Sequence, residues 1–268
     1  MKKLLAFLMA IMVFATMAAG CGGGSDKKDE KKPAAQKFIN IATGGTAGTY
    51  FPLGGAIADI LNKNVPGANA SAQSTGASVA NINLLQQDKV DIAFVQNDIA
   101  YYAVNGSEMF KDKKVPSIQG LATLYPETVQ IVTLDKTGVK SLNDVKGKRV
   151  AVGAAGSGTE ANARQILEAY GITYDDIKVQ YLSFAEASNA LKDGNVDVAF
   201  VTAGHPTAAI QDIATQNHVV LLPVDSDKAD ALIAKYPILY QTYYCSQNLP
   251  ESRSRRSGNR SSCYVGSN

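Results

Sequence analysis

An internal repeat limits the folds open to this sequence. The run VDIAFV at residues 90–95 returns as VDVAFV at 196–201, an offset of 106, and Asn83 and Leu85 return as Asn189 and Leu191. At an offset of 110, residues 41–43 and 48–49 align with residues 151–153 and 158–159. Both halves therefore carry the order strand, Gly/Thr turn, helix, strand, helix, strand. The repeat predicts two similar α/β lobes that face each other across a cleft.

The hydrophobic pattern supports this organisation. Strands are expected at residues 38–43, 70–74, 91–95, 129–134, 149–153, 196–201 and 219–222. One helix is expected where Leu53, Ile57, Ile60 and Leu61 recur at helical spacing, and others over 78–88, 159–170 and 184–193. Gly171 and Gly194 should end the last two helices, and Ser183 with Glu186 forms a capping-box pattern. Alternating strands and helices predict a parallel sheet and an α/β fold.

The Gly- and Thr-rich turns are the candidate binding site. In open parallel sheets, ligands bind beyond the carboxyl ends of the strands, where helices begin. Helix N-termini present unpaired N–H groups and a partial positive charge, so they favour an anion or carboxylate. The alternative is that the turns need Gly and Thr only for their backbone geometry and have no role in binding. The residues we expect to bind ligand are Gly45, Thr46, Thr49, Tyr50, Ser74, Thr75, Gln96, Ser157, Gly158, Thr159, Glu160 and Gly204.

Composition argues against several other functions. The only histidines are His205 and His218, so a metal site and nucleophile–histidine catalysis are not expected. No phosphate-binding loop or G-x-G-x-x-G motif occurs, and we expect no cofactor. Asp98 and Glu160 are conceivable catalytic bases, but solvated or capping carboxylates are commoner, and we expect no enzyme. The formal net charge of +2 offers no basic field for nucleic acid.

The N-terminus resembles a bacterial lipoprotein signal. Lys2 and Lys3 precede an apolar run that ends in Ala-Ala-Gly before Cys21. We expect a signal peptide over 1–20, lipidation of Cys21 and a flexible tether over 21–37, which would anchor the protein outside the cytoplasm. The alternative is a transmembrane anchor with an incidental cysteine, but the apolar run is shorter than the ~20 residues that a bilayer requires.

The C-terminus has a different composition. Residues 245–268 hold four of the six arginines, two of the three cysteines and seven serines, with no Lys or Asp. One interpretation is a natural basic, disordered tail. The other, which we favour, is a coding-frame shift near residues 237–244 that leaves an aberrant tail and an incomplete return of residues 225–244 to the first lobe.

Four motifs carry a family resemblance. Residues 43–58 (TGGTAGTYFPLGGAIA) resemble the opening of TAXI-type solute receptors, which serve TRAP transporters, the ion-driven tripartite uptake systems. Residues 74–81, 147–160, and 182–184 with Ala203-Gly204 are similar to three further motifs of that family. His205 departs from it, because the family usually has an apolar residue there.

The resemblance implies a two-lobed, type II-like periplasmic-binding-protein fold with a ligand cleft between lobe 1 (38–133) and lobe 2 (134–224). The implied function is extracytoplasmic capture of a small carboxylate or amino acid, glutamate-like or a dicarboxylate, for delivery to TRAP membrane permease subunits. A ligand-sensing lipoprotein that signals to a membrane receptor is the alternative. Because members of the family are longer, the resemblance also favours the frame-shift interpretation of the tail.

Overall fold

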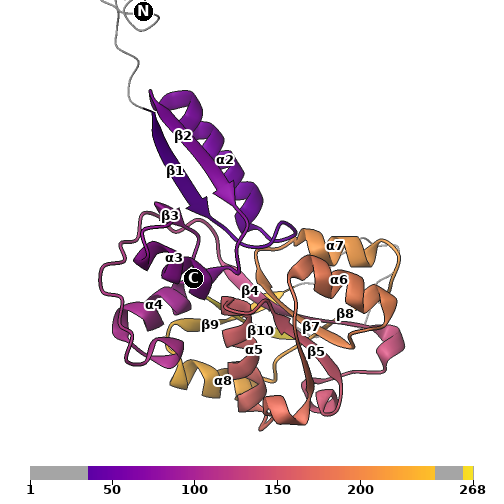
Figure 1. The fold of residues 1–268 in the computed structure, drawn as a ribbon. Helices are drawn as coiled ribbons and strands as arrows, with labels where there is room; N and C mark the ends of the chain where they lie inside the picture. Colours follow the sequence, from indigo (N-terminus) through magenta and orange to yellow (C-terminus); the bar gives the residue numbers. More distant parts are fainter. Residues whose placement is uncertain (1–35, 245–261, 268) are drawn as a thin grey trace, which may run out of the picture. The chain divides into compact units, whose positions relative to one another are not determined.

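The structure is a computed structural model that describes residues 36–244 and 262–267 (Figure 1). Residues Ala35–Asn268 form one compact unit. The predicted signal peptide, Cys21 and all but the last two residues of the tether lie outside the described residues, as do residues 245–261 of the predicted tail. In the described part of the chain, no helix has the length and apolar character needed to cross a membrane.

The N-terminal half builds a small parallel sheet. Its strands are β1 (Lys37–Ala42), β2 (Ala68–Gln73) and β3 (Ile92–Ala93), in the order β2-β1-β3. Helix α2 (Tyr50–Asn64) connects β1 to β2, α3 (Ser78–Gln86) connects β2 to β3, and α4 (Asn97–Asn105) follows β3. Each helix therefore begins at the carboxyl end of a strand, where ligands bind in this class of sheet.

The remaining strands form a seven-stranded mixed sheet. Its order is β6-β5-β7-β4-β10-β9, and β8 pairs with β4. The strands are β4 (Glu127–Leu134), β5 (Arg149–Gly153), β6 (Lys178–Tyr181), β7 (Val198–Ala203), β8 (Val219–Leu222), β9 (Leu239–Tyr244) and β10 (Ser262–Ser267). Strands β5, β6 and β7 are mutually parallel, whereas β4 runs antiparallel to β7, β8 and β10.

Strand β4 is buried along its whole length and bonds within the large sheet. Strand β10 pairs with β4 and β9, and it falls within the predicted tail. The predicted lobe and tail boundaries remain predictions.

Helices and short 3-10 turns complete the second half. The helices are α5 (Gly158–Ala169), α6 (Phe184–Asp193), α7 (Ala208–Ala214) and α8 (Ser226–Lys235). Short 3-10 helices are η2 (Asp135–Thr137), η3 (Leu142–Val145) and η4 (Tyr174–Asp176), and another, η1 (Glu108–Phe110), lies in the first half. Helices α5 and α6 connect β5 to β6 and β6 to β7, as α2 and α3 do in the small sheet.

The structure confirms the internal repeat. The parallel strands have the same order in both halves, β2-β1-β3 and β6-β5-β7. The aspartates of the repeated motif also act alike. The Asp91 carboxylate accepts a bond from the Asn40 amide (2.8 Å), and that of Asp197 accepts one from the Arg149 amide (2.8 Å). The Arg149 guanidinium adds an ion pair to Asp197 at 2.6 Å, at the end of β5 remote from the start of α5.

Two predicted boundaries need correction, and one mechanism accounts for both. The backbone N–H of Lys89 bonds to the carbonyl of Leu84 (3.0 Å), and that of Asn195 bonds to the carbonyl of Ala190 (2.7 Å). These bonds close the C-termini of α3 and α6. Helix α3 therefore ends at Gln86, before the predicted residue 88, and β7 begins at Val198, after the predicted residue 196.

Other local predictions have mixed outcomes. The Ser183–Glu186 capping box and the left-handed Gly194 are present, and Gly171 has φ +66° just after α5. Ile60 was expected on the buried face of α2, but it is 58% exposed. Strand β3 spans two residues instead of five, because only Ile92 and Ala93 pair with β1.

Three apolar clusters hold these elements. Ile41, Ala58, Ala70 and Phe94 form the core between α2 and the small sheet. The largest cluster joins residues of α3 and α4, such as Ile82 and Ile99, to residues of β5, α5 and β7, such as Val150, Ile166 and Phe200. A third lies between β5, β7, α6 and α7. The large shared cluster fixes the starts of α3 and α4 near that of α5.

Candidate functional site

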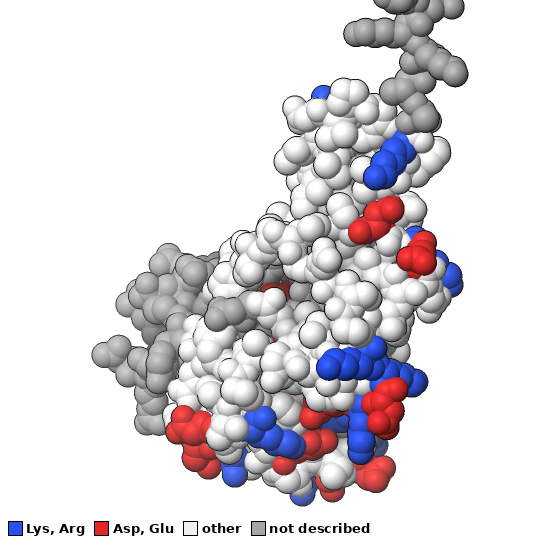
Figure 2. Space-filling view, turned by 90° about the vertical axis from the view of Figure 1, so that its left-hand side faces the viewer, with Lys and Arg blue, Asp and Glu red and all other residues white. Residues whose placement is uncertain are grey.

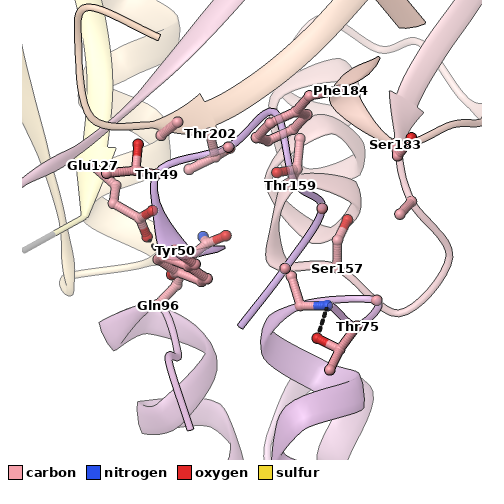
Figure 3. Close-up of a pocket in the computed structure, with 17 residues that line it drawn as sticks. Thr49, Tyr50, Thr75, Gln96, Glu127, Ser157, Thr159, Ser183, Phe184 and Thr202 are labelled. Carbon is pink, nitrogen blue, oxygen red and sulfur yellow. Dashed lines mark hydrogen bonds between the residues drawn. The ribbon is translucent and has the colours of Figure 1, made fainter. Parts of the chain in front are cut away.

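A cavity lies where the carboxyl ends of the parallel strands of both sheets meet. It holds about 530 Å³ of empty space, open mouth included, within the range of small-molecule sites. Figure 2 shows a hollow on one face of the molecule with acidic atoms inside it, whereas most charged side chains lie elsewhere. The residues lining the cavity are Gly44, Gly45, Gly48, Thr49, Tyr50, Thr75, Gly76, Ala77, Gln96, Glu127, Ala154, Ser157, Thr159, Ser183, Phe184, Thr202 and Ala203 (Figure 3).

Five helices start at the cavity wall. Their N-terminal caps line it: Thr49 (α2), Ala77 (α3), Gln96 (α4), Ser157 (α5) and Ser183 (α6). The first turn of each helix has N–H groups without intrahelical partners, and the helix dipole adds partial positive charge there. The cavity can therefore hold an anionic group without a basic side chain.

Close backbone contacts fix the turns that carry these caps. Gly76 lies so near the second half that a Cβ on it would be 3.0 Å from the carbonyl oxygen of Ala155. The amide of Ala80 donates to the carbonyl of Gly156 at 3.0 Å. Gly153 has φ +103°, and a Cβ there would lie 2.9 Å from Ser157 Oγ and from Thr159 Cβ. The chain can follow this path because these positions are glycine.

The hydroxyl groups at the cavity wall differ in the hydrogen bonds that they already make within the protein. Ser157 Oγ accepts from the Glu160 amide (3.1 Å), and Ser183 Oγ donates to the Glu186 carboxylate (2.7 Å). Thr75 Oγ1 lies 2.6 Å from Asn81 Oδ1 and accepts from the Ala77 amide. The hydroxyl of Thr159 makes no hydrogen bond within the described part of the chain. Thr159 therefore has the hydroxyl most available to a ligand.

Glu127 brings a carboxyl group into the cavity. Tyr50 donates to its Oε2 at 2.8 Å and Tyr125 to its Oε1 at 3.2 Å. Burial raises the pKa of Glu127 to about 8, although both tyrosine bonds act to lower it. Burial also raises the pKa of Tyr50 well above its usual value, so its phenol stays a neutral donor. Figure 3 shows Glu127 and Tyr50 on one side of the cavity and Ser157 and Thr75 on the other.

A buried polar cluster lies behind the wall. Asn162 on α5 donates to Asp98 Oδ2 (2.7 Å), and its carbonyl accepts from Gln96 (2.9 Å) and Thr202 (3.2 Å). Asp98 is fully buried, and this burial raises its pKa. The cluster ties the start of α4 to α5 and β7, so it fixes the wall of the cavity from behind.

Seven of the twelve sequence-predicted ligand residues line the cavity: Gly45, Thr49, Tyr50, Thr75, Gln96, Ser157 and Thr159. Thr46 and Ser74 are exposed at the surface, and Ser74 donates to the Gly44 carbonyl. Gly158 packs against the side chain of Gln96, and Gly204 packs against the ring of Tyr125. Glu160 accepts a bond from Tyr174 at 2.8 Å and lies 3.6 Å from Arg164.

Sequence reasoning missed Glu127 altogether. It opens an apolar strand and has no motif around it, and its partner Tyr50 is 77 residues away in the chain. The two carboxylates considered as catalytic bases, Asp98 and Glu160, do not line the cavity. In the described part of the chain, no cluster of His, Cys, Asp and Glu has the arrangement of a metal site.

The doubled strand–helix unit and the cavity at its strand ends define an α/β fold of the two-lobed periplasmic-binding-protein class. This fold is shared with a protein from Bordetella bronchiseptica RB50 (17% identity, 74% of this chain and 60% of that one, TM-score 0.54). It is also shared with a binding protein component of an ABC phosphonate transporter from Pseudomonas aeruginosa (16% identity, 80% and 76% covered, TM-score 0.50).

Within this class, the chain belongs to the NMT1-like family, which matches residues 41–254. Another similar structure is the alkanesulfonate-binding protein SsuA from Xanthomonas axonopodis pv. citri bound to MOPS (20% identity, TM-score 0.48). The match covers 70% of this chain and 61% of SsuA, so this chain spans about three fifths of that protein.

Proposed function

We propose that this protein is an extracytoplasmic solute receptor that captures a small carboxylate or amino acid and delivers it to a membrane permease. The observation that supports this best is the convergence of five helix N-terminal caps on one cavity. Such a wall binds an anionic group through backbone N–H groups and dipoles. The solved relatives with this fold include a binding protein of a phosphonate transporter.

We propose a TRAP-type permease as the partner, because all four TAXI-like motifs contribute to the cavity wall. The first supplies Thr49 and Tyr50, the second Thr75, the third Ser157 and Thr159, and the fourth Ser183. The likeness to a component of an ABC transporter is a likeness of fold at 16% identity, and it leaves the energy source open. Uptake into proteoliposomes that hold the permease tests this choice. An imposed ion gradient without ATP should drive uptake, and strict dependence on ATP would overturn the TRAP assignment.

We also propose that Cys21 carries the lipid that holds the receptor at the membrane. The Ala-Ala-Gly-Cys sequence supports this. Stable anchoring needs more than one acyl chain, because a single chain binds membranes only marginally. Mass spectrometry of the protein from a bacterial membrane fraction should find diacylglycerol on Cys21, and an unmodified cysteine would contradict the proposal.

Binding is tested by calorimetry and thermal unfolding with L-glutamate, L-glutamine, succinate and 2-oxoglutarate. A ligand at a hundred times its Kd should stabilise the protein by about 2.7 kcal/mol. Ala154→Phe, which puts a ring into the cavity, should abolish this response. Ala56→Phe, at an exposed position of α2, should keep it. Absence of binding by any small carboxylate or amino acid, or turnover of the bound solute, would refute the proposed function.

A further inference from the structure

The cavity, as lined by the described residues, contains an acidic side chain and no basic one, and a ligand with only carboxylate groups would add no positive charge. Glu127 is the only Asp or Glu among the described residues that line it, and these residues include no Lys, Arg or His. The two arginines of the described part lie elsewhere: Arg149 pairs with Asp197, and Arg164 lies beside Glu160. A buried carboxylate without a cationic partner is costly, so a positively charged group in the cavity would be stabilised.

The groups around Glu127 orient it as a hydrogen-bond acceptor. Tyr50 from α2 and Tyr125 from the segment before β4 each donate to a different carboxylate oxygen, at 2.8 and 3.2 Å. Each oxygen of an ionised carboxylate can accept further bonds, so an N–H donor in the cavity still has an acceptor.

The other titratable groups that interact with Glu127 do not balance its negative charge. Asp98 on α4 and Tyr240 on β9 both interact electrostatically with it, and neither supplies positive charge. The helix N-termini of the cavity offer only partial positive charge, which is less than the full charge of an ammonium group. One side of the cavity is therefore suited to an ammonium group, and the N-terminal cap of α5, Ser157, lies across from it and is suited to a carboxylate (Figure 3).

We propose that Glu127 is the acceptor for the ammonium group of the bound solute. The solute class is then an amino acid with a free amine, and dicarboxylates without an amine are excluded. This inference rests on the proposed receptor function and narrows its ligand.

Proton release should accompany binding. In the empty cavity, burial holds the pKa of Glu127 near 8, so the carboxyl group is mostly protonated at neutral pH. A bound ammonium favours the ionised form, so the carboxyl proton passes to solvent. Below pH 8, amino-acid affinity should then rise about tenfold per pH unit, since one proton leaves for each ligand bound.

The test compares matched ligand pairs on the purified full-length chain. The natural L-amino acids are screened by thermal unfolding beside succinate, glutarate and 2-oxoglutarate. The tightest amino acid is then compared with its deamino analogue, for example L-glutamate with glutarate. Calorimetry at pH 6.0, 6.75 and 7.5, in buffers with different ionisation enthalpies, counts the protons released. Glu127→Gln removes the ionisable group and keeps the side-chain size. Glu168→Gln on the exposed part of α5 is the matched control.

The expected result has three parts. The amino acid binds at least tenfold more tightly than its deamino analogue, its affinity rises with pH, and up to one proton is released. Glu127→Gln loses all three effects, and Glu168→Gln keeps them. Tighter binding of a deamino acid, or an amine preference that survives in Glu127→Gln, would overturn this inference and leave the receptor function standing. Binding of no solute at all would overturn both.

Discussion

The carboxyl group of Glu127 is under two opposed influences. Burial favours its protonated form, whereas two tyrosine hydroxyls favour its ionised form, and burial prevails with a pKa of about 8. A group with this balance changes charge near physiological pH, although it lies in the wall of a cavity. Its ionisation therefore affects both the stability of the protein and the charge offered to a ligand.

Protein stability should fall as the pH rises, because of Glu127. Its folded pKa lies above its usual 4.5, so its contribution is complete below about pH 4.5 and is lost as pH rises to about 8. The loss should reach roughly 1.4 kcal/mol per pH unit within this window. Glu127→Gln should thus gain stability relative to the wild type between pH 5 and 8 in urea unfolding. Glu168→Gln should show no such trend, and parallel curves for Glu127→Gln and wild type would contradict the assignment.

Thr159 allows a clean test of how an anion is held. Its hydroxyl lies at the start of α5 and makes no bond within the described part of the chain. Thr159→Ala should weaken binding of the tightest solute by about tenfold or more in calorimetry, because a hydrogen bond to a charged group contributes roughly 1.5–3 kcal/mol. Ser157→Ala is a less direct test, since Ser157 also caps the helix. Arg164→Ala should bind normally; if it alone abolishes binding, a side-chain cation holds the acid.

At this scale the sequence predicted the residues whose signal is local. Thr49 and Ser157 lie in turns that follow strands, and Thr159 lies at the start of the helix after such a turn, so pattern and topology together were enough to find them. Glu127 could not be found in this way. Its importance comes from burial and from Tyr50, 77 residues away, and neither leaves a trace in the neighbouring sequence.

Among the elements, α2 shows how the sequence sets helix-to-sheet distance. Gly54 faces β1 and β2, where an added Cβ would overlap the methyl group of Thr43 and touch Ala72 at 3.4 Å. Its neighbour Gly55 has open space around it. The helix can approach the sheet closely because Gly54, the glycine that faces the sheet, has no side chain. The spacing of apolar residues predicted the helix correctly, but it placed Ile60 on the buried face, where the structure has it exposed. Hydrophobic periodicity counts only apolar side chains, so it does not detect that the helix contacts the sheet through a glycine.

Adjacent glycines in α2 should therefore respond in opposite directions. Gly55→Ala should raise the free energy of unfolding by about 0.5–1 kcal/mol, because alanine loses less backbone entropy in a helix. Gly54→Ala should lower it by roughly 1–3 kcal/mol, because the helix must move away from the sheet. Urea unfolding of both variants measures the two effects. Equal effects would mean that α2 does not pack at this distance.

Helix ends were predictable where a side chain or glycine marks them. Ser183, Gly171 and Gly194 did so, and the structure confirms all three. At Asp88 the chain takes φ +52° without glycine. A non-glycine residue adopts this conformation only a few per cent of the time. The hydrophobic pattern therefore gave no sign of the helix end, and the predicted helix ran two residues too far.

For the whole molecule, cooperativity depends on the polar and apolar contacts that join the two repeated halves. Asn162 bonds to Asp98, Gln96 and Thr202, and the largest apolar cluster contains residues of both halves. Because these contacts lie behind the cavity wall, the shape of the site and the stability of the unit Ala35–Asn268 depend on the same residues. The repeat in the sequence predicted the halves but not this link, because Asp98 and Asn162 lie outside the repeated motifs.

Asn162→Ala should destabilise the molecule as a whole. It leaves the buried carboxylate of Asp98 without its 2.7 Å donor, which should cost about 2–3 kcal/mol and lower Tm by roughly 5–10 °C. Asn105→Ala removes an exposed amide that bonds to Tyr101 at the end of α4, and it should change Tm by less than about 2 °C. Calorimetry should give one transition for each protein, since the shared core prevents the halves from unfolding separately. Two resolved transitions in the wild type, or equal Tm values for the two variants, would mean that the halves are stable independently and that the Asn162 cluster does not couple them.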